Sequence, residues 1–103
     1  MTSNHRLWAR FRSENNGMTQ ISIVPVLFWD TMGEGDYHKA YVLIPPGTQM
    51  EGYAIPFDES YVINYLGRLE GFILHDNIQE EITRLNKWVE KNEDNSLYVY
   101  PKI

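Results

Sequence analysis

The sequence predicts an α+β protein, with a mostly antiparallel sheet of four to five strands and two helices packed on it, in the order β-β-β-(β)-α-α-β. Two apolar runs, at 21–30 and 40–44, are separated by a glycine-containing stretch and are typical of a hairpin at the centre of a sheet. Residues 58–91 then carry apolar side chains at helical spacing. Because the chain has 103 residues, we expect one domain over 1–103.

The first strand is predicted from alternation over residues 6–12, where Leu7, Ala9 and Phe11 share one face. Asn16-Gly17 follows, and this dipeptide is a strong signal for a two-residue hairpin turn. Residues 1–4 are polar, and we expect them to be frayed.

The second strand begins near Thr19, and its apolar residues fall on both faces, which predicts a central position in the sheet. Pro25 cannot donate a hydrogen bond to a neighbouring strand, so it marks a bulge, a bend or the outward side of an edge. A third strand is predicted over 37–44. Residues 49–57 stay open between a loop and a short strand through 53–55.

Two helices are predicted in the second half of the chain. The first starts with Asp58 as its N-cap and has an apolar stripe, with Gly67 weakening it and Gly71 as one possible end. That stripe consists of Val62, Leu66, Leu69 and Ile73. The second covers 77–91, with a stripe of Ile78, Ile82, Leu85 and Val89. A last strand is predicted over 97–100.

Composition limits the class of function. The net charge is −5, and it is uneven: residues 1–13 hold three Arg and no acid, while the remaining six basic and fourteen acidic residues give the rest of the chain −8. An acidic body disfavours nucleic acid and favours a protein partner with a basic surface. The chain has no cysteine, which fits the cytoplasm, and no stretch is long enough for a membrane helix.

The segment 30–38 carries the first candidate site. Its carboxylates Asp30, Glu34 and Asp36 lie near Trp29, Tyr37 and Tyr41, so we expect aromatic anchors ringed by acids that bind a partner protein. The same acids with His38 also suggest a cation site, but their spacing is not that of a known metal loop. We therefore predict no metal and no cofactor.

An alternative site is the arginine row of the first strand. Arg6, Arg10 and Arg12 share a face with Trp8, and guanidinium groups beside an aromatic ring can hold a phosphate and stack on a planar ligand. Tyr98 and Tyr100 are the candidate rings from the last strand. This set predicts a small-ligand binder of the nucleotide type, as the alternative to protein binding.

The leading functional prediction follows from the fourteen aromatic residues, which are more than a core of this size needs. No convergent catalytic set is visible, because the three histidines have no partner or nucleophile at a telling spacing. We therefore expect a non-catalytic, acidic protein-binding module that occludes a partner, as inhibitors, immunity proteins and host-takeover factors do. A homodimer is a further expectation from the aromatic excess.

Overall fold

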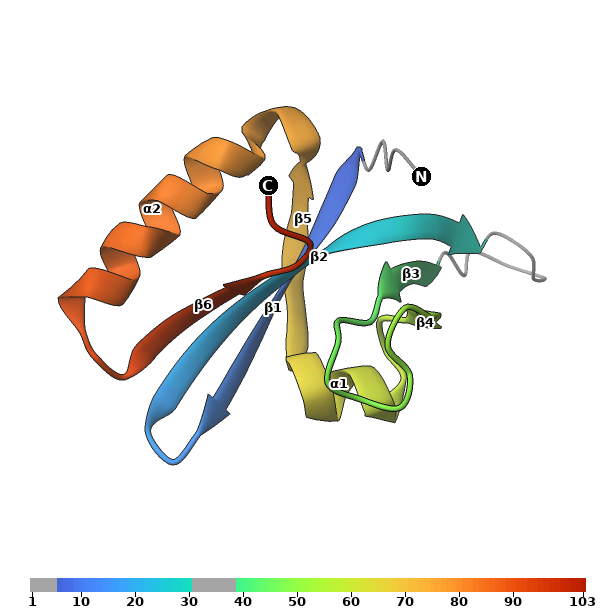
Figure 1. The fold of residues 1–103 in the computed structure, drawn as a ribbon, viewed down its shortest axis with the longest axis horizontal. Coiled ribbons are helices and arrows are strands. Elements are labelled where there is room, and N and C mark those ends of the chain that lie inside the picture. The colour runs from blue at the N-terminus through green and yellow to red at the C-terminus, as the bar shows by residue number, and fades with distance from the viewer. Residues whose placement is uncertain (1–5, 31–38) are drawn as a thin grey trace.

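The computed structural model describes residues 6–30 and 39–103, and it confirms the α+β class (Figure 1). Within these residues, a six-stranded sheet carries two helices. The elements are β1 (Leu7–Asn15), β2 (Met18–Asp30), β3 (Lys39–Leu43), β4 (Ala54–Pro56), α1 (Ser60–Leu66), β5 (Arg68–Leu74), the 3₁₀ turn η1 (His75–Asn77), α2 (Ile78–Lys91) and β6 (Asn95–Val99). No helix in the described part of the chain is long and apolar enough to cross a membrane.

The long strand β2 organises the sheet, as its apolar character predicted. The strand order is β4-β3-β2-β1-β5 with antiparallel neighbours, and β6 pairs with β2 in parallel. β6 pairs with residues 19–23 of β2, and β3 pairs with residues 26–30. Pro25 lies between these two stretches, next to a register shift at Val26–Phe28. Of the bulge, the bend and the edge position predicted for Pro25, the structure shows an irregularity of the bulge type directly after it, where β2 passes from one neighbour to the other.

The hairpin between β1 and β2 has the predicted two-residue turn. Asn15 pairs with Met18, and the turn residues Asn16 and Gly17 have φ angles of 54° and 80°. Positive φ at both central positions is the conformation that matches the twist of the two flanking strands. Local sequence therefore determines the register of this pair.

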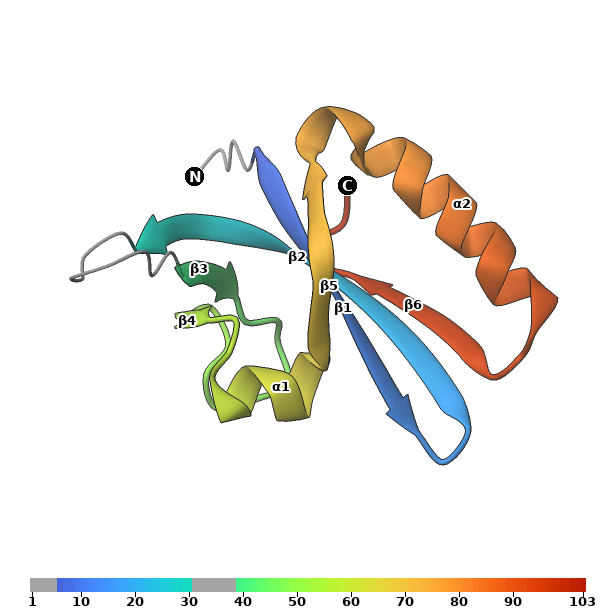
Figure 2. The ribbon, with the colours of Figure 1, turned by 180° about the vertical axis from the view of Figure 1, so that it is seen from behind.

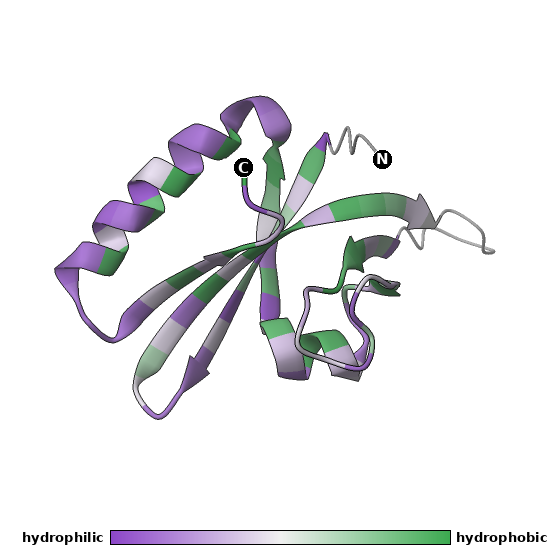
Figure 3. Ribbon diagram, viewed as in Figure 1, coloured by the Kyte–Doolittle hydropathy of each residue, from purple (hydrophilic) through white to green (hydrophobic). Residues whose placement is uncertain are grey.

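Each face of the sheet buries its own apolar cluster. One cluster contains Ala9, Phe11, Val24 and Val42 and is covered by α1 and the segment that joins β3 to α1. The other contains Trp8, Ile21, Ile23 and Ile73 and is covered by α2 through its predicted stripe, including Ile78 and Leu85. Figure 3 shows the hydrophobic and hydrophilic faces of α2 along its length. The sheet is thus the middle layer. One of its faces is covered by α1 and the segment that joins β3 to α1, and the other face is covered by α2.

The first helix of the second half ends at Leu66, so its prediction is wrong beyond that residue. Residues 68–74 form β5, an edge strand that runs between α1 and η1 (Figure 2). Gly67 ends the helix: it has φ 105°, and its N–H bonds the carbonyls of Val62 and Ile63. The helical spacing of Leu69 and Ile73 was a coincidence, because a register shift in the pairing of β5 with β1 breaks the strand alternation.

Two smaller predictions have opposite outcomes. The short strand left open within 49–57 exists as β4, paired with β3. Asp58, in contrast, does not cap α1, whose N-cap residue is Glu59. The Asp58 carboxylate instead forms a 3.2 Å ion pair with Lys39 of β3 and so ties the start of α1 to the sheet.

Candidate functional site

Exposed apolar side chains gather where the C-terminal end of β2 meets β5. Trp29 is 42% exposed and Phe72 is 40% exposed, yet their rings contact each other at a centroid distance of 5.2 Å. Leu74 follows Phe72 by two residues on β5 and is 59% exposed. We call Trp29, Phe72 and Leu74 the aromatic edge patch.

The register of the strands explains why these three residues meet. Phe72 lies opposite Ala9, and Trp29 lies opposite Ala40. Both alanines belong to the cluster beneath α1, so Trp29 and Phe72 point to that face of the sheet. The curl of the sheet then brings the end of β2 over the edge strand β5, although 43 residues separate the two rings in sequence.

The predicted partner-binding residues are only partly brought together. Tyr41 pairs with Phe28, and their rings stack at 4.4 Å, on the face of the β2–β3 ladder opposite to Trp29. Trp29 therefore contacts Phe72 of β5 and points away from Tyr41. Exposed rings thus lie on both faces of this end of the sheet.

The acidic part of that predicted site lies mostly outside the described residues. This holds for Glu34, Asp36 and Tyr37, and also for His38 of the cation interpretation. Asp30 is the last residue of β2 and pairs through its backbone with Lys39. The described part of the predicted surface therefore consists of the rings of Trp29 and Tyr41 and the backbone of Asp30.

Two members of the arginine row of the alternative site, Arg10 and Arg12, form ion pairs. Both oxygens of Glu70 accept hydrogen bonds, one from Nε of Arg10 and one from Nε of Arg12, each at 2.9 Å. Arg10 also lies 3.5 Å from Glu81 of α2, and Arg12 lies 3.5 Å from Glu14. These guanidinium groups join β1, β5 and α2 to one another.

Two of the rings expected beside that row, Trp8 and Tyr98, do not form an exposed stacking surface with it. Trp8 is 3% exposed and packs in the cluster beneath α2, where its Nε1 donates a 3.1 Å hydrogen bond to Nδ1 of His75. Tyr98 pairs with Ser22, so it lies on the opposite face of the sheet from the arginines. Burial, with the nearby Tyr65 and Tyr100, raises the pKa of the Tyr98 hydroxyl above 10.0. Trp8, Tyr98 and the Arg10–Arg12 pair of the predicted small-ligand set therefore do not line one open site.

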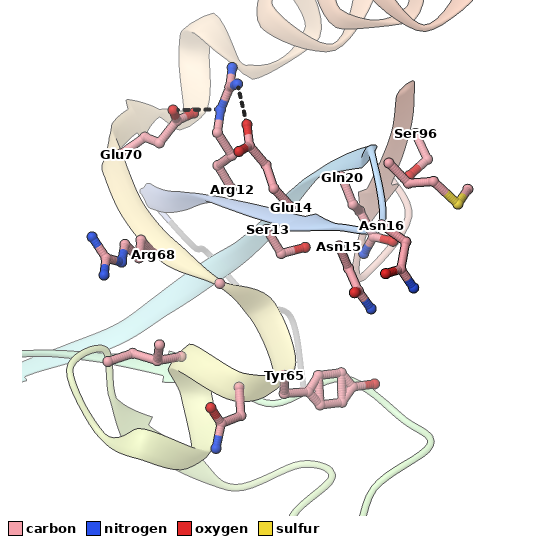
Figure 4. A pocket seen from close by; sticks show the side chains of 14 residues that line it. Arg12, Ser13, Glu14, Asn15, Asn16, Gln20, Tyr65, Arg68, Glu70 and Ser96 are labelled. Atoms are coloured by element: carbon pink, nitrogen blue, oxygen red, sulfur yellow. Dashed lines mark hydrogen bonds and ion pairs between the residues drawn. The ribbon is translucent and has the colours of Figure 1, made fainter. Parts of the chain in front are cut away.

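A polar hollow that the sequence did not reveal lies between α1 and the β1–β2 hairpin (Figure 4). Its volume is about 960 Å³, and neutral amides and hydroxyls line much of it, among them Ser13, Asn15, Gln20, Asn64 and Ser96. Within the hollow, the carboxylates of Glu14 and Glu70 are bonded to Arg12. Such a lining can form hydrogen bonds with a bound group but offers no acid–base pair around a nucleophile.

Sequence reasoning missed Phe72 and Leu74 because it placed them at or beyond the end of a helix. The signal that could have found them is the run Phe72-Ile73-Leu74, which is rich in strand-forming residues directly after Gly71. The described residues thus present exposed rings and paired charges. Comparisons with protein-family models, curated proteins and solved structures find no match for this chain.

Proposed function

We propose that this protein is a non-catalytic protein-binding module that acts by occluding a partner protein. The observation that carries the proposal is the aromatic edge patch, in which Trp29, Phe72 and Leu74 are each at least 40% exposed and lie at one end of the sheet. Large aromatic side chains in such a cluster are the residues that most often dominate the binding energy of a protein interface.

Charge supports a partner with a basic surface. The chain carries a net −5, and all fourteen of its acidic residues lie after residue 13. A field of this sign accelerates the encounter with a basic protein and weakens as salt is added. We therefore assign the binding energy of the complex mainly to the aromatic edge patch. We assign the faster encounter with a basic partner to the acidic residues.

The test is capture of a partner from a native lysate by the immobilised full chain, read by mass spectrometry. We expect the double variant Trp29→Ala with Phe72→Ala to reduce the recovery of the partner about tenfold or more. The matched control is Tyr53→Ala, which removes a 59% exposed ring that lies elsewhere, on the segment before β4.

Both variants must remain folded under the conditions of the capture experiment. A urea titration checks this through the midpoint of unfolding. Equal recovery by the wild type, the patch variant and the control would reject the aromatic edge patch as the binding surface. Failure of the wild type to capture any protein above an unrelated acidic control would reject protein binding itself.

A further inference from the structure

One backbone edge of the strand β5 is unpaired within the described part of the chain. The strand pairs with β1 on one side, and no strand among the described residues pairs with its other side. The N–H of His75 donates to the carbonyl of Arg6 at 2.8 Å, so by antiparallel alternation Ile73 and Gly71 face β1. The N–H and C=O groups of Phe72 and Leu74 then point outward, where they can pair with another strand.

A groove runs beside this edge. It lies between β5 and α2 and has a volume of about 790 Å³, with Phe72 and Ile73 on the strand side. The helix side presents residues spaced three or four apart, which belong to one face of α2 and of the turn before it. These residues are Asn77, Glu80, Glu81, Thr83, Arg84 and Lys87.

Gly71 lines a second, smaller hollow, which shares Phe72, Ile73 and Glu81 with the groove. A Cβ built on Gly71 meets no atom within 4 Å. The space around it, about 340 Å³, is bounded by Arg10, Glu70, Ile73 and Glu81. A glycine within a strand often marks a bulge or a place where another chain approaches closely, and a register shift does lie beside Gly71. The hollow is large enough to receive a side chain from that other chain.

We infer that an extended segment of a partner protein adds to the sheet as a strand along residues 71–74 of β5, in the groove between β5 and α2. Backbone hydrogen bonds to Phe72 and Leu74 would hold it, and one of its side chains would enter the hollow at Gly71. This inference rests on the proposed protein-binding function and names the shape of the partner segment.

The charged side chains of the groove favour neither an acidic nor a basic segment, so the shape of the groove decides which segment fits. Arg10, Arg84 and Lys87 oppose Glu70, Glu80 and Glu81, so the positive and negative side chains along the groove balance. The four residues 71–74 of β5 carry no charge and no proline, the usual devices that keep a strand edge from pairing. A second copy of this chain would approach with its own α2 beside its own β5, so a lone extended segment is the better fit.

The experiment selects random linear dodecapeptides by display against the immobilised full chain. For a selected peptide, we expect the substitution Gly71→Val to raise Kd about tenfold or more, because the valine fills the hollow. Asn86→Ala, on an exposed position of α2 that does not line the groove, is the matched control and leaves Kd unchanged.

Two further readouts are specific to strand addition. Methylation of successive backbone nitrogens of the peptide should weaken binding at every second position, because only alternate residues of an added strand face β5. Amide hydrogen exchange at Phe72 and Leu74 should slow in the complex. Selection of no peptide would overturn the inference, as would a peptide insensitive to Gly71→Val.

Other outcomes separate this inference from the proposed function. A peptide that loses affinity in Trp29→Ala and keeps it in Gly71→Val binds the aromatic edge patch, so strand addition fails while protein binding stands. A wild-type dimer that Gly71→Val converts to a monomer assigns the edge to a second copy and likewise overturns the inference.

Discussion

The ring of Trp29 contacts the ring of Phe72 at 5.2 Å, and this contact joins the end of the central strand β2 to the edge strand β5. Neither ring is buried. The pair therefore has two roles open to it: it holds the curled sheet together, and it presents apolar surface to solvent. A measurement of stability separates the first role from the second.

We expect the two rings to be coupled in folding. A double-mutant cycle of Trp29→Ala and Phe72→Ala, measured by urea unfolding, should give a coupling free energy of about 0.5–1.5 kcal/mol, the usual range for an aromatic pair. Met18→Ala, at the opposite end of β2, should be additive with Trp29→Ala. Additivity in both cycles would show that the rings are neighbours without a stabilising contact.

We expect any substitution of Gly67 to lower the free energy of unfolding. It has φ 105°, and a Cβ at this position would lie 2.2 Å from the carbonyl oxygen of Arg12, a backbone atom that cannot move aside. Gly67→Ala should lower the free energy of unfolding by about 2–5 kcal/mol, from backbone strain and overpacking together. Gly71→Ala is the control, because it has open space and no positive φ, and it should change stability by less than about 1 kcal/mol. Equal losses would contradict the close approach of α1 to β1.

The hydrogen bond from Trp8 to His75 ties the start of β1 to the turn before α2. The ring of His75 accepts at Nδ1 over 3.1 Å, so it carries its proton on Nε2. We expect His75→Ala to lower the free energy of unfolding by about 1 kcal/mol. His75→Gln keeps an acceptor and should lose less, with the indole N–H resonance of Trp8 shifted upfield only in the alanine variant. Identical behaviour of the two variants would argue against the hydrogen bond.

Tyr98 predicts how stability depends on pH at the alkaline end. Burial, and then the charges of Tyr65 and Tyr100, raise its pKa in the folded protein above the ordinary tyrosine value of 10.0. The unfolded chain therefore loses this proton first, so stability is unaffected below pH 10 and falls as the pH rises from there through the folded pKa. Urea unfolding at increasing pH should show this fall in the wild type and a smaller fall in Tyr98→Phe. The same alkaline loss in both proteins would remove Tyr98 as its cause.

Several elements could be predicted because their signals are local. Positive φ at Asn16 and Gly17 makes the first hairpin, and the stripe of Ile78 and Leu85 makes α2. The polar residues beside the turn and on the other face of α2 are consistent with these two assignments. The strand β5 was misread because a register shift and a chance helical spacing coincide at residues 66–73.

Only part of the candidate surface could be predicted from the sequence. The excess of aromatic residues indicated that some rings face outward, and Trp29 was among those named. Which ring lies next to Trp29 could not be predicted, because Phe72 comes from a strand that pairs with β1, and β1 in turn pairs with β2. Only the curl of the complete sheet brings the two rings together.

The sequence by itself determined the α+β class, the turn at Asn16-Gly17 and the apolar face of α2, since each depends on residues close together in the chain. The tertiary structure alone decided that Trp8 is buried, that Arg10 and Arg12 share Glu70, and that one edge of β5, beside α2, pairs with no strand of residues 6–30 and 39–103. The physical reason is that burial, ion pairing and strand neighbours depend on long-range contacts, which no local pattern of residues specifies.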